Sequence, residues 1–297
     1  MHHDTHLDRT ERAARIALTE AMTNHGITLT PYAKATDVLA LAPELIRQDT
    51  PLSKGLAGAL AYDGERALTE GEDSGARYLI PTDPEWPAAL RATGPLAPLG
   101  LWVKGTPCLT ESASEAVAMV GPAAASDYGT HCASYLADGL ATFGHNTVAA
   151  AIGPNGVGAA ALTACSMRNG LPIGVLAGGY PEQAPAATLR FFDSILNDGG
   201  LLVSLHRPGA PTSRTRMVKR EALIGALAQA VTVVEGASGK WETAARVAEH
   251  LGRPLLAIPG PITSSLSDLP NKLIAERRAQ AVRASVNIIA RIHAARD

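Results

Sequence analysis

Residues 231–260, VTVVEGASGKWETAARVAEHLGRPLLAIPG, decide the fold class of this chain. A short apolar run at Val231–Glu235 predicts one strand, and a second run at Leu255–Ile258 predicts another. The residues between the two runs have the spacing of a helix. Strands that follow one another through a crossover helix run parallel, and a parallel sheet is covered by helices on both faces. The segment therefore predicts one unit of an α/β sheet.

The same alternation of apolar runs and helical stretches extends back towards residue 77. Further strands are predicted at Tyr78–Ile80, Leu99–Val103, Ala116–Val120, Thr147–Ile152, Ile173–Ala177 and Leu201–Ser204. Right-handed crossovers place the helices on both faces of such a sheet. We therefore predict an α/β fold, a doubly wound, mainly parallel Rossmann-like sheet over residues 77–283, followed by a C-terminal helix within 284–297. In this fold, ligands bind in the loops after the strands.

The first 72 residues have a helical period instead. Asp8 can cap one helix, and Asp37 precedes the apolar face of another. The run Glu70–Gly75 is acidic and contains two glycines, a composition typical of a linker. We therefore predict a small all-helical N-terminal region over residues 1–72, joined by this linker to the sheet domain.

Composition limits the functions that are open to the chain. Its 297 residues are 46% hydrophobic with a formal net charge of −2, so any contact with nucleic acid must come from a local basic patch. The three cysteines are far apart and form no CxxC pair, which argues against both a disulfide framework and a structural zinc site. No apolar run has the length of a signal peptide or of a membrane span. We expect a cytoplasmic protein with no membrane association and no bound metal.

Two of the predicted strand-end loops are rich in glycine. In the first, Gly121 frees the turn and Ser126 can cap the next helix, so an anion could dock at that helix N-terminus. In the second, GPNGVG at 153–158, the backbone N–H groups around Asn155 and Gly156 could cradle a phosphate. An ordinary strand–turn–helix connection, with glycines for close packing, explains both loops equally well.

Neither glycine-rich loop has the pattern of a nucleotide cofactor site. The order in 153–158 is GxxGxG instead of GxGxxG, and no Asp or Glu follows before Gly179 to bind a ribose. The Gly-Lys pair at 239–240 is not a P-loop, because that motif needs glycine at Val234 and Ser or Thr at Trp241. The chain also has no GxSxG or HExxH motif. We therefore predict a binding protein with no cofactor, not an enzyme.

The strongest local charge lies between His206 and Arg220. This segment contains no carboxylate and five cations, namely Arg207, Arg214, Arg216, Lys219 and Arg220. Five cations beside a parallel sheet suit a polyanion such as a nucleic-acid backbone. A solvated loop is the alternative, and it explains the missing carboxylates less well. The last strand-end loop adds the donors Ser238, Gly239, Lys240 and Thr243. Trp241 beside them could stack on a base, although packing is the more common role.

The order of these segments resembles the DprA/Smf family. The most specific pieces are YLIPTDPEWPAAL at 78–90, SDYG at 126–129 and VVEGASGKWETAARVAEHLGRPLLAIPG at 233–260, and Asn271 follows where the family has an asparagine. The resemblance covers about residues 78–283. It implies an extended Rossmann fold, binding of single-stranded DNA without sequence preference, a homodimer, and loading of a RecA-type recombinase onto DNA during natural transformation and recombination.

The chain departs from the family pattern in the basic pocket that this resemblance implies. The family's GSR is Gly121-Pro-Ala123 here, its SGxARGID is AIGPNGVG at 151–158, and its FPxRNR is MVKREA at 217–222. Two phosphate-contacting arginines are thereby lost, which predicts roughly 10-fold or more weaker DNA binding.

The predicted DNA- or phosphate-binding residues are Gly121, Ser126, Tyr128, Asn155, Gly156, Arg214, Arg216, Lys219, Arg220, Ser238, Gly239, Lys240, Thr243 and Asn271. Two alternatives stay open. One is a nucleotide-like small-molecule binding or sensing protein of a related Rossmann-like family. The other is a family member that kept the fold and its partner surface but lost DNA binding.

Overall fold

The computed structural model describes residues 2–23, 34–47, 50–94, 97–181, 183–238 and 241–296. The chain divides into two compact units. Unit 1 contains Met1–Lys104, Ala177–Gln183 and Ser204–Lys219. Unit 2 contains Gly105–Leu176, Ala184–Val203 and Arg220–Asp297. Each unit is built around its own set of buried side chains, so each is taken in turn.

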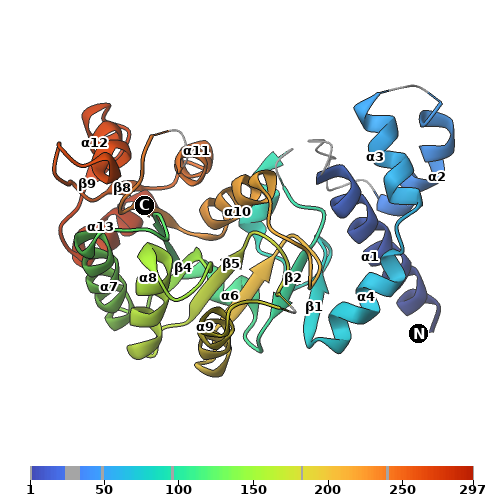
Figure 1. Cartoon of the computed structure of the whole chain (residues 1–297), viewed down its shortest axis with the longest axis horizontal. Coiled ribbons are helices and arrows are strands. Elements are labelled where there is room, and N and C mark those ends of the chain that lie inside the picture. The colour runs from blue at the N-terminus through green and yellow to red at the C-terminus, as the bar shows by residue number, and fades with distance from the viewer. Residues whose placement is uncertain are drawn as a thin grey trace. The chain divides into compact units, whose positions relative to one another are not determined.

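Unit 1 begins with four helices, which confirm the predicted helical N-terminal region. They are α1 (His2–Thr23), α2 (Ala35–Leu45), α3 (Pro51–Leu60) and α4 (Gly64–Asp73) (Figure 1). Helix α1 packs two faces into two apolar clusters, one formed with α2 and α3 around Leu18 and Leu56, and one with α4 around Ile16 and Leu68. The unit also contains a pair of antiparallel strands, β1 (Ala76–Leu79) and β2 (Leu101–Lys104), with the short helix α5 (Ala88–Arg91) between them.

The predicted linker is wrong over residues 70–73, which form the last turn of α4. Gly71 is a packing residue there, because a Cβ at this position would lie 2.0 Å from Cζ3 of Trp102. Two predicted helix starts also differ from the structure. Asp8 lies inside α1 and pairs with Arg12 at 2.8 Å, and Asp37 lies in the first turn of α2. The proposed domain boundaries at 72, 77 and 283 stay a prediction.

Unit 2 is a mainly parallel sheet, and the predicted α/β class is confirmed. Its strands are β3 (Ala116–Val120), β4 (Asn146–Ala150), β5 (Pro172–Leu176), β6 (Leu201–Ser204), β7 (Ala230–Val233), β8 (Leu255–Ala257) and β9 (Gln280–Ala281). They lie in the order β6-β5-β4-β3-β7-β8-β9. Strand β3 pairs in parallel with β4 on one side and with β7 on the other. The chain therefore winds outward from β3 in both directions, as a doubly wound sheet does.

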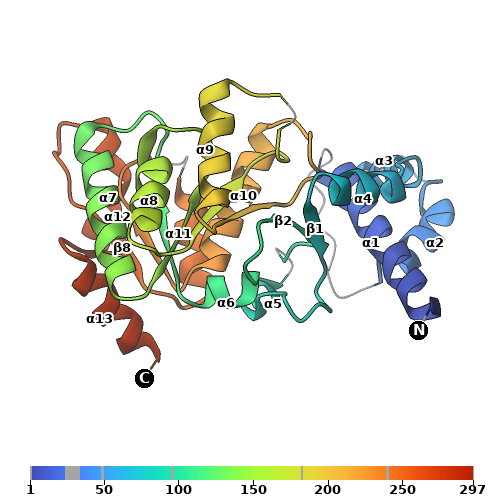
Figure 2. The ribbon, with the colours of Figure 1, turned by 90° about the horizontal axis from the view of Figure 1, so that it is seen from below.

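Helices cover both faces of this sheet. Their bounds are α6 (Leu109–Ser114), α7 (Asp127–Thr142), α8 (Gly156–Met167), α9 (Ala186–Asn197), α10 (Arg214–Leu227), α11 (Glu242–His250), α12 (Asp268–Ala275) and α13 (Ser285–Arg296), with a 3-10 turn η2 (Ser265–Ser267). Figures 1 and 2 show α7, α8 and α9 on one face and α10 and α11 on the other. Right-handed crossovers in the two winding directions require this division.

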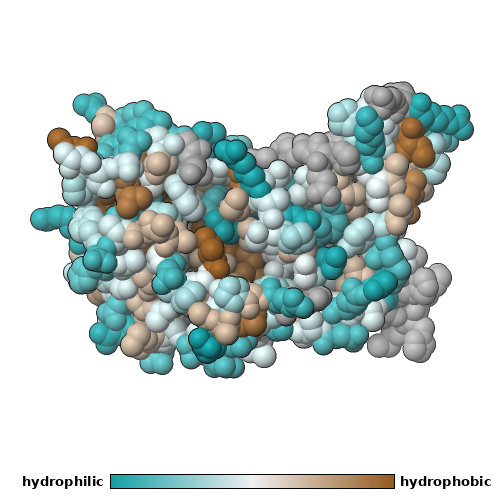
Figure 3. All heavy atoms as spheres, viewed as in Figure 1, coloured by the Kyte–Doolittle hydropathy of each residue, from teal (hydrophilic) through white to brown (hydrophobic). Residues whose placement is uncertain are grey.

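The surface carries hydrophobic side chains as separate patches. On the face drawn in Figure 3, the brown areas are small and are separated by residues of intermediate and hydrophilic character. Single exposed apolar side chains of this kind, such as Met167 (80% exposed) and Ile262 (95% exposed), are normal for a globular protein. Among the residues described, none of the helices combines the length and the apolar character that a bilayer span requires.

Candidate functional site

Most of the predicted site residues lie in unit 2, in the loops at the carboxyl ends of its strands. They are Gly121, Ser126 and Tyr128 after β3, Asn155 and Gly156 after β4, Ser238 and Thr243 after β7, and Asn271 on α12. Arg220 also belongs to unit 2, whereas Arg214, Arg216 and Lys219 belong to unit 1. Gly239 and Lys240 fall outside the described residues.

The loops after β3 and β7 are joined by a buried carboxylate. Glu235 is 2% exposed and follows β7. One of its carboxylate oxygens accepts the Ser126 backbone N–H at 3.0 Å, and the other accepts the Ser126 hydroxyl. The Ser126 Oγ in turn accepts the N–H of Gly129 at 3.1 Å, so Ser126 caps α7 as the sequence predicts. The charge of Glu235 thus lies against the positive end of α7.

The anion at the N-terminus of α7 is therefore supplied by the protein itself. The sequence predicts an open helix end there for an external anion, and the structure shows that Glu235 fills it. A signal for this arrangement exists in the sequence at Gly129, since a Cβ there would lie 2.3 Å from the Glu235 carboxylate. A glycine in the first turn of a helix otherwise lowers helix stability.

The loop after β4 leaves the end of its helix without a side-chain cap, and one first-turn donor, the Val157 N–H, is used by the Pro122 carbonyl at 3.1 Å. Asn155 is the N-cap of α8, is exposed, and makes no capping hydrogen bond with its side chain. The first turn of α8 contains no acidic residue. The backbone at Gly156 is left-handed, with φ +86°, and a Cβ there would lie 2.4 Å from the Pro122 carbonyl oxygen. This glycine therefore packs the β4 loop against the β3 loop, and it leaves Asn155 at the surface.

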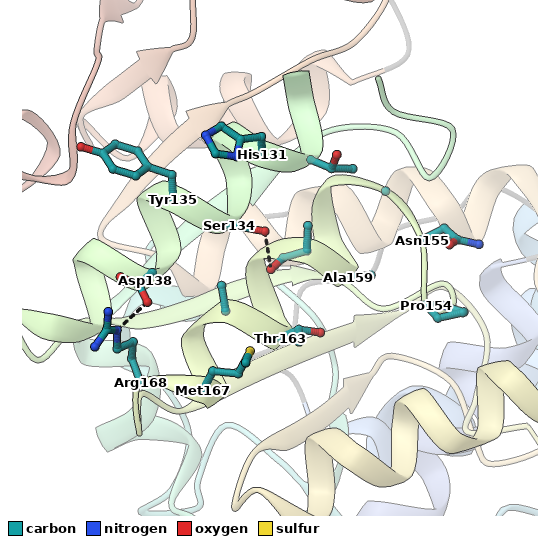
Figure 4. A pocket seen from close by; sticks show the side chains of 14 residues that line it. His131, Ser134, Tyr135, Asp138, Pro154, Asn155, Ala159, Thr163, Met167 and Arg168 are labelled. Carbon is teal, nitrogen blue, oxygen red and sulfur yellow. Dashed lines mark hydrogen bonds and ion pairs between the residues drawn. The ribbon is translucent and has the colours of Figure 1, made fainter. Parts of the chain in front are cut away.

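A groove continues from this loop along the outer surface of α7 and α8. Its volume is about 810 Å³, and its lining includes His131 and Tyr135 from α7 and Asn155 and Met167 from α8 and the preceding loop (Figure 4). An ion pair between Asp138 and Arg168, 2.5 Å apart, lies at the far end. No sequence motif predicts this groove. Its signal is the i, i+4 spacing of His131 and Tyr135, which places both side chains on one face of α7.

The backbone donors of the loop after β7 are used within the protein. The Gly236 N–H donates to the Leu266 carbonyl at 2.6 Å, and the Ser238 N–H donates to Asp268 at 3.1 Å. The hydrogen bonds from Ser238 lower the pKa of Asp268. Trp241 packs on this loop, because a Cβ on Gly236 would lie 2.7 Å from its ring. Trp241 is thus placed as a packing residue.

Asn271 and Tyr128 both hold the Pro259–Gly260 turn. The Asn271 side-chain amide donates to the Gly260 carbonyl at 3.0 Å and accepts the Gly260 N–H at 3.1 Å. The Tyr128 hydroxyl donates to the Pro259 carbonyl at 2.8 Å, while its side chain stays 45% exposed. Partial burial, together with neighbouring Cys132, raises the pKa of Tyr128 to about 12. Of these two residues, Tyr128 keeps an aromatic surface that is open to solvent.

In unit 1, the basic segment folds around a carboxylate from α1. Glu20 accepts Arg216 Nη2 at 2.7 Å and the Arg207 backbone N–H at 3.0 Å, and it lies 3.3 Å from Nδ1 of His206. Arg216 also donates to the Pro211 carbonyl at 2.8 Å. Burial raises the pKa of Glu20, but the bonds from His206, Arg207 and Arg216 outweigh it and leave the pKa below its usual value.

Two more of the predicted cations are also engaged. Lys219 donates to the hydroxyl of Thr23 at 3.0 Å, and burial with a neighbouring arginine lowers its pKa. Arg220 is 4% exposed and pairs with Glu221 at 2.7 Å. Arg214 is exposed, and the described residues offer its side chain no hydrogen bond or ion pair.

The sequence predicts a row of cations that face a polyanion, and the structure corrects this for Arg216 and Arg220. Both guanidinium groups are buried, and a buried charge requires a partner. The segment itself contains no carboxylate, but Glu20 precedes Arg216 by 196 positions and meets it in the folded chain. Arg214 is the predicted cation that this segment presents to solvent. Whether any of these residues contacts DNA stays a prediction.

Comparison with known proteins assigns the chain to a family. The family model described as DNA recombination-mediator protein A matches residues 77–293. The DprA protein of Mycobacterium tuberculosis is 38% identical over 205 residues, which cover 65% of this chain and 52% of that protein. The chain thus spans about half the length of the curated relatives it matches.

Solved structures agree on the fold. DNA processing protein A (DprA) of Streptococcus pneumoniae matches with a TM-score of 0.72 at 23% identity, over 96% of both chains. DNA processing protein A of Helicobacter pylori matches with a TM-score of 0.60 at 21% identity, over 72% of this chain and 94% of that one. With a family model that matches well over half of its residues, the chain belongs to the DNA recombination-mediator protein A family, the DprA/Smf proteins.

Proposed function

We propose that this protein binds single-stranded DNA without sequence preference and acts as a recombination mediator. In this role it loads a RecA-type recombinase onto DNA that enters by natural transformation or arises in recombination. Family membership supports the proposal, and the Helicobacter pylori relative was solved to explain a single-stranded DNA binding mode. We propose a cytoplasmic homodimer as the working form.

The observation that carries the DNA-binding proposal is the N-terminus of α8, which no side chain caps and where the Val157 N–H alone among the first-turn donors of the described residues is given a partner, the Pro122 carbonyl. Two helices begin at the same edge of the sheet, and Glu235 occupies the start of α7. The start of α8 instead presents the exposed residues Pro154 and Asn155 and has no acidic residue in its first turn. A phosphate is stabilised at such a helix end by backbone N–H groups and by the helix dipole. This loop is therefore our proposed contact for the DNA backbone.

A charge-only substitution tests the proposed contact. Asn155→Asp keeps a good N-cap and suits the positive end of α8, so the fold should be retained. The new carboxylate lies where a phosphate would bind, and we expect about tenfold weaker binding of a fluorescein-labelled oligo-dT, measured by anisotropy at low ionic strength. Asn197→Asp makes the same charge change on the exposed end of α9, before β6, and should bind as the wild type does.

The two parts of the proposal fail in different ways. A wild-type protein with no salt-dependent binding of oligo-dT at low ionic strength contradicts DNA binding altogether. Equal losses in Asn155→Asp and Asn197→Asp contradict the placement of the contact at α8.

The burial of Arg216 and Arg220 favours a second candidate function. A family member whose cations are consumed by internal ion pairs could retain its partner surface without binding DNA. Under this candidate, immobilised protein retains a RecA-type recombinase in a pull-down while oligo-dT anisotropy stays flat. Loss of both activities would contradict it.

A further inference from the structure

A second cavity lies at the opposite edge of the unit 2 sheet, at the amino end of β8. It has a volume of about 490 Å³ and is bounded by the turn before β8, the end of α12, β9 and α13. Its lining contains no Asp or Glu and includes four arginines, namely Arg253, Arg277, Arg278 and Arg291. The two termini of the strands thus carry different chemistry, and this cavity is separate from the loops of the proposed DNA contact.

Two of the four arginines are fixed in place by the protein. Arg253 Nη1 donates to the carbonyls of Gly225 and Ala226 at 3.0 and 2.9 Å, and burial lowers the pKa of Arg253 to about 10. Arg278 forms a bidentate pair with Glu249 at 2.7 and 2.9 Å. Carbonyls orient Arg253 without cancelling its charge, whereas Glu249 largely neutralises Arg278.

Arg277 stands where a side chain is unfavourable. Helix α12 ends at Ala275, and the Arg277 N–H closes it by donating to the Ile274 carbonyl at 3.0 Å. The backbone at Arg277 is left-handed, with φ +57°, a conformation in which helices most often use glycine. Within the described residues, its exposed guanidinium has no hydrogen bond or ion pair. A strained residue with an unpaired charge beside a cavity indicates a role for the side chain.

Arg291 completes the arrangement from α13. Its side chain donates to the neutral side-chain amide of Gln280 on β9, so its charge is not cancelled by that contact. Arg253, Arg277 and Arg291 thus line one cavity from three separate elements.

We propose that this cavity is a binding site for a phosphate-type oxyanion. Guanidinium groups recognise carboxylates and phosphates through paired N–H donors. A carboxylate offers two oxygens in one plane, whereas a phosphoryl group offers three or more oxygens in a tetrahedral array and up to two negative charges. Three arginines that approach from different sides match the second geometry. The proposal does not depend on the proposed function, because the site lies at the other end of the strands.

Residue-resolved protection is the direct test. The full chain is treated with phenylglyoxal, which modifies accessible arginines, with and without inorganic pyrophosphate, and each arginine is followed by mass spectrometry. Pyrophosphate should slow modification of Arg277 and Arg291 by about fivefold or more. Arg190, an exposed arginine on α9, should react at an unchanged rate. Equal protection of all three arginines, or of none, overturns the proposal.

Variants test the same site by affinity. Arg277→Gly removes the charge and suits the left-handed backbone, so this variant should be at least as stable as the wild type. We expect about tenfold weaker pyrophosphate binding by calorimetry for Arg277→Gly and for Arg291→Ala, and no change for Arg190→Ala. Wild-type affinity in both pocket variants overturns the site. Asn155→Asp should keep full pyrophosphate affinity at this cavity. A failure of the oxyanion site can therefore be distinguished from a failure of the DNA contact.

The source of the phosphate group is decided by competition. If a DNA backbone supplies it, oligo-dT relieves the protection by pyrophosphate and itself protects Arg277. If a free phosphate compound supplies it, oligo-dT leaves the protection unchanged. Both results keep an oxyanion at the cavity, whereas absence of saturable pyrophosphate binding to the wild type rejects it.

Discussion

Glu235 shows how one residue can decide what a helix end is able to bind. Its carboxylate is buried and is satisfied by the Ser126 N–H and hydroxyl, 109 positions earlier in the chain. A buried carboxylate is stable only when its oxygens are hydrogen-bonded. The same contact connects the loops after β3 and β7, so this residue both fills the α7 terminus and fixes the edge of the site.

Replacement of Glu235 should therefore destabilise the fold in graded steps. Glu235→Ala removes the acceptor of both donors of the half-buried Ser126 and should lower the free energy of unfolding by about 2 kcal/mol. Glu235→Gln keeps one acceptor and should cost about 1 kcal/mol. Urea unfolding followed by circular dichroism measures both. Glu65→Ala removes an exposed carboxylate from α4 and should change stability by less than about 0.5 kcal/mol. A Glu235→Ala variant as stable as Glu65→Ala would refute the role.

His206 is one of two buried histidines, with His145, whose titration should be visible in stability. Burial lowers the pKa of His206, and the nearby positive charges of Arg216 and Lys219 lower it further. The contact with Glu20 raises the pKa, but by less. The folded protein therefore keeps His206 neutral to a lower pH than the unfolded chain, which takes up a proton near the ordinary histidine pKa of about 6.5. Stability should fall as the pH drops from about 7 towards 5, because the unfolded state binds more protons. The pKa of Glu20 is lowered too, so its contribution is lost only at lower pH.

A non-titrating variant isolates this effect. His206→Asn places an amide N–H near the position of Nδ1 and cannot gain a proton, so the fall in unfolding free energy between about pH 7 and 5 should flatten. His131→Asn, at an exposed position on α7, should keep the wild-type slope. An unchanged slope in His206→Asn would show that another group controls the acid side.

These residues also show why the site was only partly predictable from the sequence. Gly121, Ser126, Asn155 and Gly156 are local turn and cap signals, and the structure places all four in strand-end loops at the predicted edge. Charge pairing is not local. The sequence segment around Arg216 contains no acid, and its partner Glu20 comes from a helix that only the fold brings near.

At the scale of elements, the loop pair after β3 and β4 depends on the absence of one side chain. Gly156 has φ +86° and would direct a Cβ to 2.4 Å from the backbone of Pro122 and Ala123. Gly144 has a similar φ of +81°, with nothing within 4 Å of a Cβ. The two glycines share a backbone requirement and differ in the space around them.

Substitutions at Gly144 and Gly156 distinguish the cost of backbone strain from the cost of a packing clash. Gly144→Ala should lower the unfolding free energy by about 1 kcal/mol, the usual cost of a left-handed non-glycine residue. Gly156→Ala adds a clash with backbone and should lower it by at least about 2 kcal/mol. Urea midpoints at constant m-value measure both changes. Equal losses in the two variants would mean that the loops relax without cost and that Gly156 has no packing role.

Element bounds followed from the sequence where apolar runs are long. The predictions for β3 and β6 agree with the structure at both ends, because both strands are fully buried and each is preceded by a polar or glycine residue. Strand β9 has two residues, Gln280 and Ala281, and both are exposed, so no apolar run marks it. The prediction of a linker at 70–73 is wrong because Gly71 is needed for packing within a helix. A side chain there would clash with the ring of Trp102.

At the scale of the whole molecule, the number of cations without an ion-pair partner determines how DNA binding should respond to salt. The chain has a net charge of −2, and two arginines of its basic segment are in ion pairs, Arg216 with Glu20 and Arg220 with Glu221. Each phosphate neutralised on single-stranded DNA adds about −0.7 to the slope of log K against log salt concentration. Few exposed cations therefore predict a shallow slope and a large share of binding from backbone N–H groups.

We expect a slope of about −1 to −2 for oligo-dT between about 50 and 200 mM salt, measured by anisotropy. Arg214→Ala should make the slope shallower by about 0.7. This exposed cation can neutralise one phosphate and so release the counterion condensed on the DNA there. Arg66→Ala removes an exposed arginine of α4 that is paired with Glu70 and should leave the slope unchanged. A slope steeper than about −4 would require several phosphate contacts and would show that the buried ion pairs open when DNA binds. An Arg214→Ala slope equal to the wild type would remove the basic segment from the interface and leave the α8 loop as the proposed contact.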